Sequence, residues 1–468
     1  MNPLALPQPE YKAVFERITQ VALEYLASID ERPSFPAVSG SNTEALFSKP
    51  LSENGIGIAA LNELSAVIDG LRPGGPRFFG YVMGSGEPVA AAADLLASVL
   101  NQNVTAWRSG PSAATLERVV VGWLAEAIGC KGFRGSLTGG GSPANLMGLA
   151  MAREACLPAN ETGARPGTIY ASEQIHMSVP KAVALLGIGR DHLRLIACDE
   201  EFRIRTDLLR KAIRRDLRAG LTPIAVVGSA GTVSTGSIDP LHELAVIARE
   251  FGVWFHVDGA YGALAAIAEP RKFAGLSEAD SLSLDPHKWL YQPLDCGCLL
   301  YRDAAAARRA FSHTGDYAKA LLDDPIEGFA FFEESIELSR RFRALKLWLS
   351  LRYHGLASFR EAIRNDLAMA QHLAALIAKQ HELELLAPIP LSALCFRYRV
   401  ERDSDSLNQK ILQAVIRRGR VFLSNASIHG RFALRACIVN HRTTTADVEQ
   451  VVSEVIAVGR ELTPGSES

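Results

Sequence analysis

The feature that most constrains the fold is a regular alternation of short apolar runs with helical stretches between residues 78 and 353. This alternation is typical of an α/β protein whose central sheet is mostly parallel and carries helices on both faces. The strand-like runs are residues 167–171, 193–196, 224–228, 253–257, 281–284 and 297–301. The helical stretches are residues 90–100, 114–128, 143–156, 179–186, 206–219 and 240–251.

Different patterns flank this region on both sides. Residues 10–32 and 56–71 have helical periodicity, and we expect residues 39–53 between them to be a loop. After a helix at 360–380, strand-like runs at 383–386, 393–398, 420–423 and 433–439 alternate with helices at 407–418 and 445–458. We therefore predict three parts, which are an N-terminal helical segment (1–76), a large domain (77–358) and a smaller α+β C-terminal domain (359–468). The N-terminal helices have too little core to fold alone, so we expect them to pack on another surface, such as a second subunit.

Composition and charge argue against several classes of protein. The net charge is −2 and no run of one sign is long enough to indicate a nucleic-acid or membrane surface. No segment reaches the roughly 18 uninterrupted apolar residues of a membrane span, and the N-terminus lacks a signal-peptide pattern. The 7 cysteines are irregularly spaced and indicate neither a metal site nor a disulfide framework. We expect a cytoplasmic protein without a metal.

Two charged residues follow strand-like runs in the central region. Asp258 comes directly after residues 253–257, and Lys288 comes just past residues 281–284. An acid and a lysine at the ends of two buried strands suit a pyridoxal 5'-phosphate (PLP) site. The lysine amine would bond to the cofactor aldehyde, and the carboxylate would keep the pyridine nitrogen protonated so that the ring accepts electrons. Either residue alone would be an ordinary snorkelling lysine or turn cap.

A glycine-rich segment supplies a place for the cofactor phosphate. Gly140, Gly141 and Ser142 directly precede the helical stretch 143–156. Backbone N–H groups at a helix N-terminus bind anions, and glycine lets the backbone approach them closely. Neither a nucleotide P-loop pattern nor a dinucleotide G-x-G-x-x-G pattern is present. Alone, the segment is equally consistent with a helix-capping turn; with Lys288 it indicates a phosphate site.

Three further residues lie near expected strand ends. His176 lies between a strand-like run and a helix, where it could stack on the pyridine ring, although a lone histidine there is more often a loop or capping residue. Ser229 follows residues 224–228, so its hydroxyl could reach cofactor or substrate, or could belong to a tight turn. Ala260, two residues past Asp258, suits a small contact under the ring.

These segments resemble the group II PLP-dependent amino-acid decarboxylases. That family includes aromatic-L-amino-acid, histidine, glutamate, cysteine-sulfinate and diaminobutyrate decarboxylases. The resemblance covers about residues 76–444, and its most specific part is Pro286-His287-Lys288-Trp289. It implies an α/β fold of the PLP-dependent transferase-like kind (fold type I). The other matching segments are residues 77–81, 106–107, 111–117, 173–176, 256–261, 339–346 and 434–437.

The resemblance also implies cofactor-binding roles. Lys288 would carry the cofactor, Asp258 would pair with the pyridine nitrogen, and His176 would stack on the ring. The phosphate would be bound by Gly140, Gly141 and Ser142, with help from His287.

Further residues are implied to contact the substrate. Arg435 would lie near its carboxylate, and Tyr81 would also bind substrate. Tyr317, within residues 313–328 that match the family's mobile catalytic loop, would help to protonate the carbon after CO2 leaves.

The implied activity is decarboxylation of an L-amino acid to its amine and CO2 in a homodimer, with an aromatic substrate favoured. Three departures leave the substrate open. Asp285 replaces the usual Asn of the aromatic branch, residues 82–84 replace its Phe-Pro-Thr, and Thr105 replaces an aromatic residue. The alternatives are a decarboxylase of a non-aromatic amino acid such as glutamate or diaminobutyrate, an aldehyde-forming oxidative decarboxylase and an aminotransferase.

Overall fold

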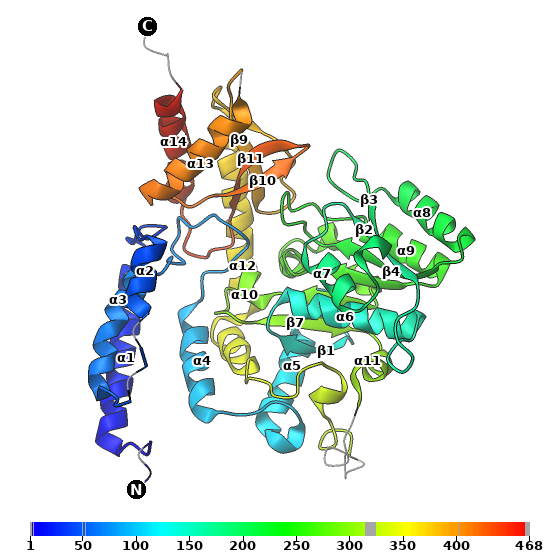
Figure 1. Ribbon diagram of the computed structural model, residues 1–468, viewed down its shortest axis with the longest axis horizontal. Helices are drawn as coiled ribbons and strands as arrows, with labels where there is room; N and C mark the ends of the chain where they lie inside the picture. The colour runs from blue at the N-terminus through cyan, green and yellow to red at the C-terminus, as the bar shows by residue number, and fades with distance from the viewer. Residues whose placement is uncertain are drawn as a thin grey trace.

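A seven-stranded sheet forms the centre of the computed structural model, which describes residues 2, 4–48, 50–51, 53–313, 324–401 and 403–463 (Figure 1). The strand order is β1-β7-β6-β5-β4-β2-β3. Strands β3, β2, β4, β5 and β6 are parallel, whereas β7 is antiparallel to both of its neighbours. The strands are β1 (Arg134–Thr138), β2 (Gly167–Ser172), β3 (Leu193–Ile196), β4 (Thr222–Ser229), β5 (Trp254–Asp258), β6 (Ser281–Leu284) and β7 (Gly297–Tyr301). The predicted α/β class is confirmed.

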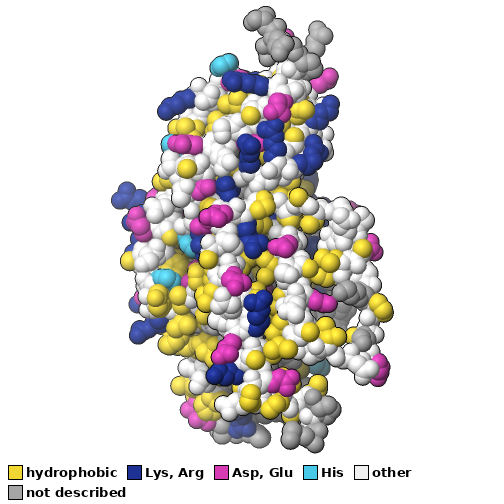
Figure 2. All heavy atoms as spheres, turned by 90° about the vertical axis from the view of Figure 1, so that its left-hand side faces the viewer, with side chains coloured by type: hydrophobic (Ala, Val, Ile, Leu, Met, Phe, Trp, Pro, Cys, Tyr) yellow, Lys and Arg dark blue, Asp and Glu magenta, His cyan; other side chains and the backbone are white. Residues whose placement is uncertain are grey.

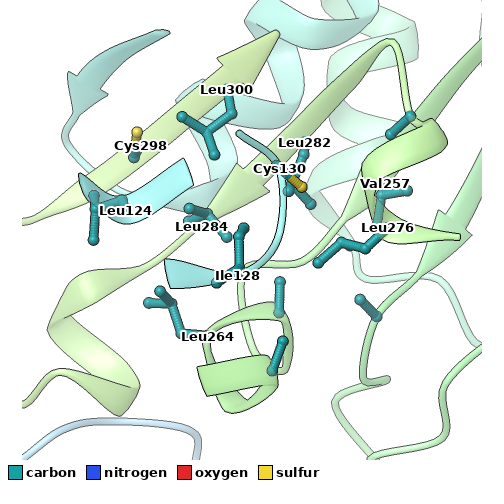
Figure 3. Packing of buried hydrophobic residues seen from close by; sticks show 14 of the residues in the cluster. Leu124, Ile128, Cys130, Val257, Leu264, Leu276, Leu282, Leu284, Cys298 and Leu300 are labelled. Atoms are coloured by element: carbon teal, nitrogen blue, oxygen red, sulfur yellow. The ribbon is translucent and has the colours of Figure 1, made fainter. Parts of the chain in front are cut away.

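Helices cover both faces of this sheet because its strands are apolar on both sides. In β7, Cys298 and Leu300 belong to one buried cluster, and Leu299 and Tyr301 belong to another. Figure 3 shows part of the first cluster, in which Leu300 lies above Leu284. The first cluster includes α5 (Pro111–Ala127), α8 (Thr206–Arg218) and α9 (Leu241–Phe251), and the second includes α6 (Gly141–Cys156), α7 (Ser178–Leu185) and α11 (Ala304–Phe311).

A four-stranded antiparallel sheet, in the order β10-β11-β9-β8, forms the C-terminal part. The helix α12 (Ala344–Ala378) is kinked at Gly355 and links the two parts, because its Ile363 packs in the first cluster and its Ile377 in the core of the small sheet. The predicted boundary at residue 358 therefore lies inside this helix. The other elements here are β8 (Leu383–Leu385), β9 (Ala393–Tyr398), β10 (Ser424–Ile428), β11 (Arg431–Cys437), α13 (Ser404–Arg418) and α14 (Thr445–Leu462).

The N-terminal helices lie along one side of the molecule (Figure 1). None of the residues in α1, α2 or α3 is buried. None of the described helices combines the length and the apolar composition that a membrane crossing needs. The helices of the N-terminal part are α1 (Gln8–Ser28), α2 (Gly40–Phe47), η1 (Gly57–Glu63), α3 (Leu64–Asp69) and α4 (Pro88–Leu100). Short helices elsewhere are η2 (Trp107–Ser109), η3 (Arg190–His192), η4 (Ala263–Ile267), η5 (Pro270–Phe273), η6 (Leu276–Glu278), α10 (Pro286–Trp289) and η8 (Phe331–Glu333).

The structure differs from the sequence-based expectations at three places. The expected loop at residues 39–53 contains helix α2, because the Ser39 hydroxyl accepts the Asn42 N–H and caps its start. The expected strand at residues 420–423 is wrong, since the ladder begins at Ser424 and Phe422 forms only an isolated bridge. Strand β1 was not expected at all.

Candidate active site

A cavity of about 290 Å³ lies where β4, β5 and β6 end and helix α6 begins. The register brings these strand ends together, because Ser229 pairs with Asp258 and Asp258 pairs with Ser283. The carboxyl ends of parallel strands form the usual ligand-binding edge of such a sheet. The predicted residues that line the cavity are Gly140, Gly141, Ser142, His176, Ser229, Asp258, Ala260, His287 and Lys288.

Asp258 is a buried carboxylate that two donors hold in place. The Ser283 hydroxyl on the neighbouring strand donates to Asp258 Oδ1 at 3.1 Å. The backbone N–H of Ala260 approaches the same oxygen at 3.3 Å. Because β5 ends at this residue, the Asp258 carboxylate lies at the cavity wall in a fixed position.

Lys288 lies in the short helix α10, directly after β6. Its Nζ is 2.9 Å from Asp285 Oδ2. Asp285 is itself buried, and its Oδ1 has no hydrogen-bond partner among the described residues. A Cβ atom on Gly141 would lie 3.1 Å from Asp285 Oδ2, so this carboxylate adjoins the glycine-rich segment. The lysine amine and the expected phosphate site are therefore neighbours of one carboxylate.

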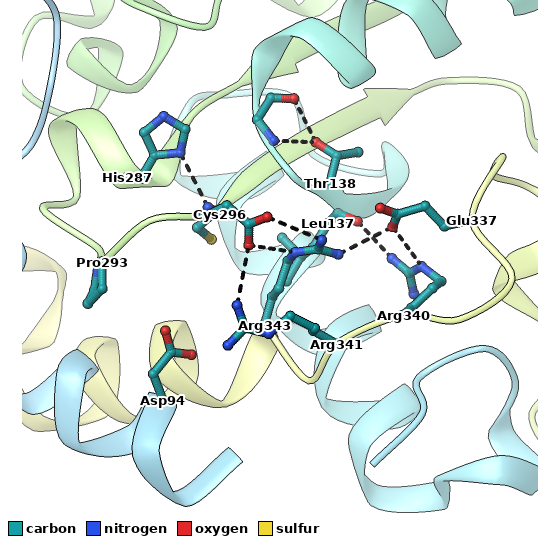
Figure 4. Close-up of polar contacts among 12 residues, drawn as sticks. Asp94, Leu137, Thr138, His287, Pro293, Cys296, Glu337, Arg340, Arg341 and Arg343 are labelled. Atoms are coloured by element: carbon teal, nitrogen blue, oxygen red, sulfur yellow. Dashed lines mark hydrogen bonds and ion pairs between the residues drawn. The ribbon is translucent and has the colours of Figure 1, made fainter. Parts of the chain in front are cut away.

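The glycine-rich segment opens the N-terminus of α6 to the cavity. Gly140 has a φ of +133°, and the Thr138 hydroxyl donates to the Gly140 carbonyl at 2.9 Å (Figure 4). A Cβ atom on Gly141 would lie 2.6 Å from the Ala260 Cβ, closer than two side chains can approach. The first N–H groups of a helix have no partner within it, so this backbone can bind an anion.

His287 faces this region with its Nε2, because its Nδ1 is bound to the backbone. Its Nδ1 accepts the Cys296 N–H at 3.3 Å (Figure 4), so the proton of the neutral ring is on Nε2. That nitrogen is 3.6 Å from Asp285 Oδ2. Burial lowers the pKa of His287, which favours the neutral ring.

His176 also lines the cavity as a neutral ring. Its Nδ1 accepts the backbone N–H of Ser178 at 3.2 Å and lies 2.8 Å from the Ser178 hydroxyl. Burial lowers the pKa of His176, and the Asp258 charge opposes this effect, while the Lys288 charge adds to it. The neutral ring therefore carries its proton on Nε2.

The remaining predicted residues are placed differently. Arg435 is buried outside the cavity lining, where its Nε donates to the Val233 carbonyl at 2.8 Å and its Nη1 to the Tyr81 carbonyl at 2.9 Å. Its Nη2 has no partner within the described residues. The Tyr81 side chain is exposed and packs near Phe78. Tyr317 lies outside the described residues.

Comparisons with known proteins agree with this geometry. The family model described as the pyridoxal-dependent decarboxylase conserved domain matches residues 62–399. The chain belongs to the pyridoxal-dependent decarboxylase family. Such an enzyme is a carboxy-lyase, and its cofactor is PLP.

Relatives of this decarboxylase carry several functional names. An aromatic-L-amino-acid decarboxylase from Bacillus atrophaeus is 37% identical over 396 residues, which are 83% of this chain and 82% of the relative. A phenylacetaldehyde synthase from Petunia hybrida is 33% identical and covers 78% of this chain and 76% of its own length. The crystal structure of Oryza sativa TDC with PLP and tryptamine superposes with a TM-score of 0.91 at 27% identity, covering 99% of both chains.

The residues at the cavity fit PLP. A cradle without Cβ atoms at the start of α6 suits the phosphate, and Asp258 suits the protonated pyridine nitrogen. Lys288 is partly buried beside a carboxylate, within the lining. One feature of this decarboxylase is unusual for a phosphate site, namely the buried Asp285 carboxylate, whose Oδ1 has no hydrogen-bond partner within the described part of the chain.

Several polar residues of the site were not predicted from the sequence. Ser283 donates to Asp258, and Asn145 and Ser178 line the cavity near His176. Two signals were available in the sequence. Ser283 lies in the strand-like run before Lys288, and Asn145 lies one helical turn after the glycine-rich segment.

Proposed function

We propose that this enzyme decarboxylates an aromatic L-amino acid to the corresponding amine and CO2. The observation that carries the proposal is the convergence of Lys288, Asp258 and His176 on one cavity at the start of α6. The aromatic preference is supported by relatives named aromatic-L-amino-acid, tyrosine and tryptophan decarboxylases, at 30–37% identity. A solved structure of Catharanthus roseus tryptophan decarboxylase in complex with L-tryptophan has a TM-score of 0.90 to this chain.

Five residues of the cavity have a proposed task. When bound, PLP supplies a ring that accepts the electrons left behind by CO2. Lys288 would hold the cofactor through its amine, and Asp258 would keep the proton on the pyridine nitrogen. His176 would lie against the ring, while Gly140 and Gly141 would bind the phosphate through backbone N–H groups.

Arg435 is proposed to orient the substrate carboxylate. Its guanidinium is buried, and Nη2 has no protein partner within the described part of the chain. A buried, unpaired donor of this kind is costly unless a ligand satisfies it. Arg435 also donates a hydrogen bond to the carbonyl of Val233, and Val233 lines the cavity. Arg435 is therefore directly behind a residue of the cavity wall.

Protonation of the α carbon is proposed to involve Tyr317, on the basis of the family resemblance. Since Tyr317 lies outside the described residues, its position is not an argument for this role. His176 is the second candidate donor, because it lines the cavity and its Nε2 carries a proton.

We also propose that the enzyme is a homodimer. In α1, the large apolar side chains of Tyr11, Phe15 and Leu23 are 45%, 41% and 57% exposed. Figure 2 shows the side of the molecule on which α1 to α3 lie, where many apolar side chains reach the surface among charged ones. Exposed apolar surface of this extent is typical of subunit interfaces.

A product analysis tests the proposed function. Purified enzyme with PLP is mixed with a panel of aromatic, acidic and basic L-amino acids, and CO2, amine, aldehyde and peroxide are measured. The proposal expects equal amounts of CO2 and amine from an aromatic member. The relative named phenylacetaldehyde synthase makes aldehyde formation the second candidate, and aldehyde with peroxide in place of amine would establish it. Turnover of acidic or basic members alone would overturn the aromatic assignment.

A further inference from the structure

A row of buried polar contacts runs from the sheet to His176. The side chains of Trp254, His256 and Asp258 alternate along β5 and therefore share the face that α6 covers. Only Asp258 among these has a task in the proposed function. The contacts, in order, are Trp254 Nε1 to Ser281 Oγ at 2.8 Å, Ser281 Oγ to His256 Nδ1 at 2.8 Å, His256 Nε2 to Asn145 Oδ1 at 3.0 Å, Asn145 Nδ2 to Ser178 Oγ at 2.9 Å and Ser178 Oγ to His176 Nδ1 at 2.8 Å.

The two ends of this row impose the same direction on its protons. At one end, the Trp254 indole can only donate, so Ser281 accepts there. Among the hydrogen bonds of the described residues, His256 Nδ1 is the one acceptor available to the Ser281 hydroxyl proton. At the other end, the backbone N–H of Ser178 already makes His176 Nδ1 an acceptor.

The middle of the row agrees with that direction. Burial lowers the pKa of His256 to about 4, so the ring is neutral at pH 7 and has one N–H group. If its Nδ1 accepts from Ser281, its Nε2 donates to the Asn145 carbonyl oxygen. The Asn145 amide then donates to Ser178, and the Ser178 hydroxyl donates to His176. Every nitrogen and oxygen atom in the row then has at least one hydrogen-bond partner.

Helix α6 is shaped to admit the buried histidine. A Cβ atom on Gly148 would lie 2.5 Å from His256 Cε1, which is closer than such atoms approach. His256 is fully buried, and a buried polar side chain without partners would be destabilising. The fold thus makes room at Gly148 for a ring whose two nitrogens are both used.

We propose that Trp254, Ser281, His256, Asn145 and Ser178 form a directed hydrogen-bond relay that positions His176, holding its Nδ1 as an acceptor and its proton on Nε2. In this role they are positioning residues, because each acts on the cofactor through His176, although Asn145 and Ser178 also line the cavity. The role rests on the proposed place of His176 against the cofactor. Two donors to Nδ1 must be displaced before that nitrogen can take a proton, so the relay keeps the ring neutral.

The relay predicts that a substitution far from His176 changes the pKa of that residue. In Ser281→Ala, His256 Nδ1 loses its donor, so the reversed tautomer is no longer disfavoured. The Asn145 amide can then turn over, and the Ser178 hydroxyl can donate to Asn145 instead of His176. His176 keeps only the backbone donor, and its pKa should rise by up to about 0.5–1 unit. Ser178→Ala removes the same donor directly and should give the full rise.

Carbon-13 NMR titration of the His176 ring in the PLP-loaded enzyme tests this, with the signal assigned through His176→Gln. Ser178→Ala and Ser281→Ala should both raise the His176 pKa, and the double variant should equal Ser178→Ala alone. The other charged groups that face His176, which are Asp258, Lys288, Asp285 and Lys181, are unchanged in these variants.

A matched control is Ser136→Ala, which removes another fully buried hydroxyl, one with no partner within the described residues, from strand β1 of the same sheet. It should leave the His176 pKa unchanged. If Ser281→Ala does not fold, Trp254→Phe cuts the relay at its first donor and should raise the pKa likewise. An unchanged pKa in the folded remote variant, or additive shifts in the double variant, would overturn the relay. Neither result depends on which amino acid the enzyme consumes.

Discussion

At the scale of single residues, the site combines side chains that are far apart in the sequence. Asp258 and Lys288 could be identified from sequence because Asp258 directly follows one short apolar run and Lys288 lies just past another. Asn145 and His256 were not identified, because their contact spans 111 positions of the sequence. Their local signals, a polar residue one turn into a helix and a polar residue inside an apolar strand, do not show that the two meet.

Asp258→Asn should reduce kcat by about ten- to a hundredfold, because a neutral amide cannot hold the pyridine proton through a charge-assisted hydrogen bond. Cofactor binding should remain substantial, since the phosphate contacts are untouched. Steady-state kinetics and a fluorescence titration with PLP measure the two effects. Ser283→Ala, which leaves the carboxylate but removes one of its donors, should have a much smaller effect. Near-normal turnover in Asp258→Asn would refute the proposed role.

Tyr317→Phe should keep PLP and substrate bound but lose amine formation, because phenylalanine cannot donate a proton to the α carbon. Amine and aldehyde are quantified after incubation with the preferred amino acid. The diverted carbanion would react with O2, so aldehyde, ammonia and peroxide are the expected products. Unchanged amine production would transfer the proton-donor role to His176.

At the scale of elements, the parallel strands place the site and helix α6 supplies the phosphate cradle. The alternation of apolar runs predicted the five parallel strands β2 to β6 of the large sheet. It also predicted β7. Each of these strands is a short buried run between helices. Strand β1 was missed, since Arg134–Thr138 contains Gly135 and only one large apolar residue, Leu137. It is stabilised by pairing with β7, which is a tertiary contact.

Gly141→Ala should abolish tight PLP binding, because the new Cβ would lie 2.6 Å from Ala260 Cβ at the start of α6. Gly122→Ala is the matched control in helix α5, where a Cβ would meet nothing within 4 Å. It should leave PLP binding unchanged and raise stability by up to about 1 kcal/mol, since alanine is a better helix former. PLP titration and thermal unfolding of both variants measure this. Equal PLP affinity in the two would contradict the proposed cradle.

At the scale of the whole molecule, a large sheet, a small sheet and an exposed N-terminal helical segment are joined by one chain. The helix α12 contributes to the cores of both sheets, so the two parts share a continuous packed interior. None of the residues of α1 is buried, so the apolar side of this helix needs another surface to pack against.

The enzyme should therefore be a dimer in solution. Light scattering coupled to size-exclusion chromatography should give twice the mass of the 50.5 kDa chain. Phe15→Glu with Leu23→Glu places charges on the exposed apolar side of α1 and should shift the mass toward that of the monomer. A wild-type monomer that is fully active at nanomolar concentration would contradict the dimer.

The most direct test of the whole account is to locate the cofactor. Holoenzyme is reduced with borohydride, which makes the bond between the cofactor aldehyde and a lysine amine permanent, and the digested peptides are mapped by mass spectrometry. A pyridoxyl group on Lys288 is expected, together with loss of the visible absorption band. A pyridoxyl group on another lysine, or on none, would contradict it.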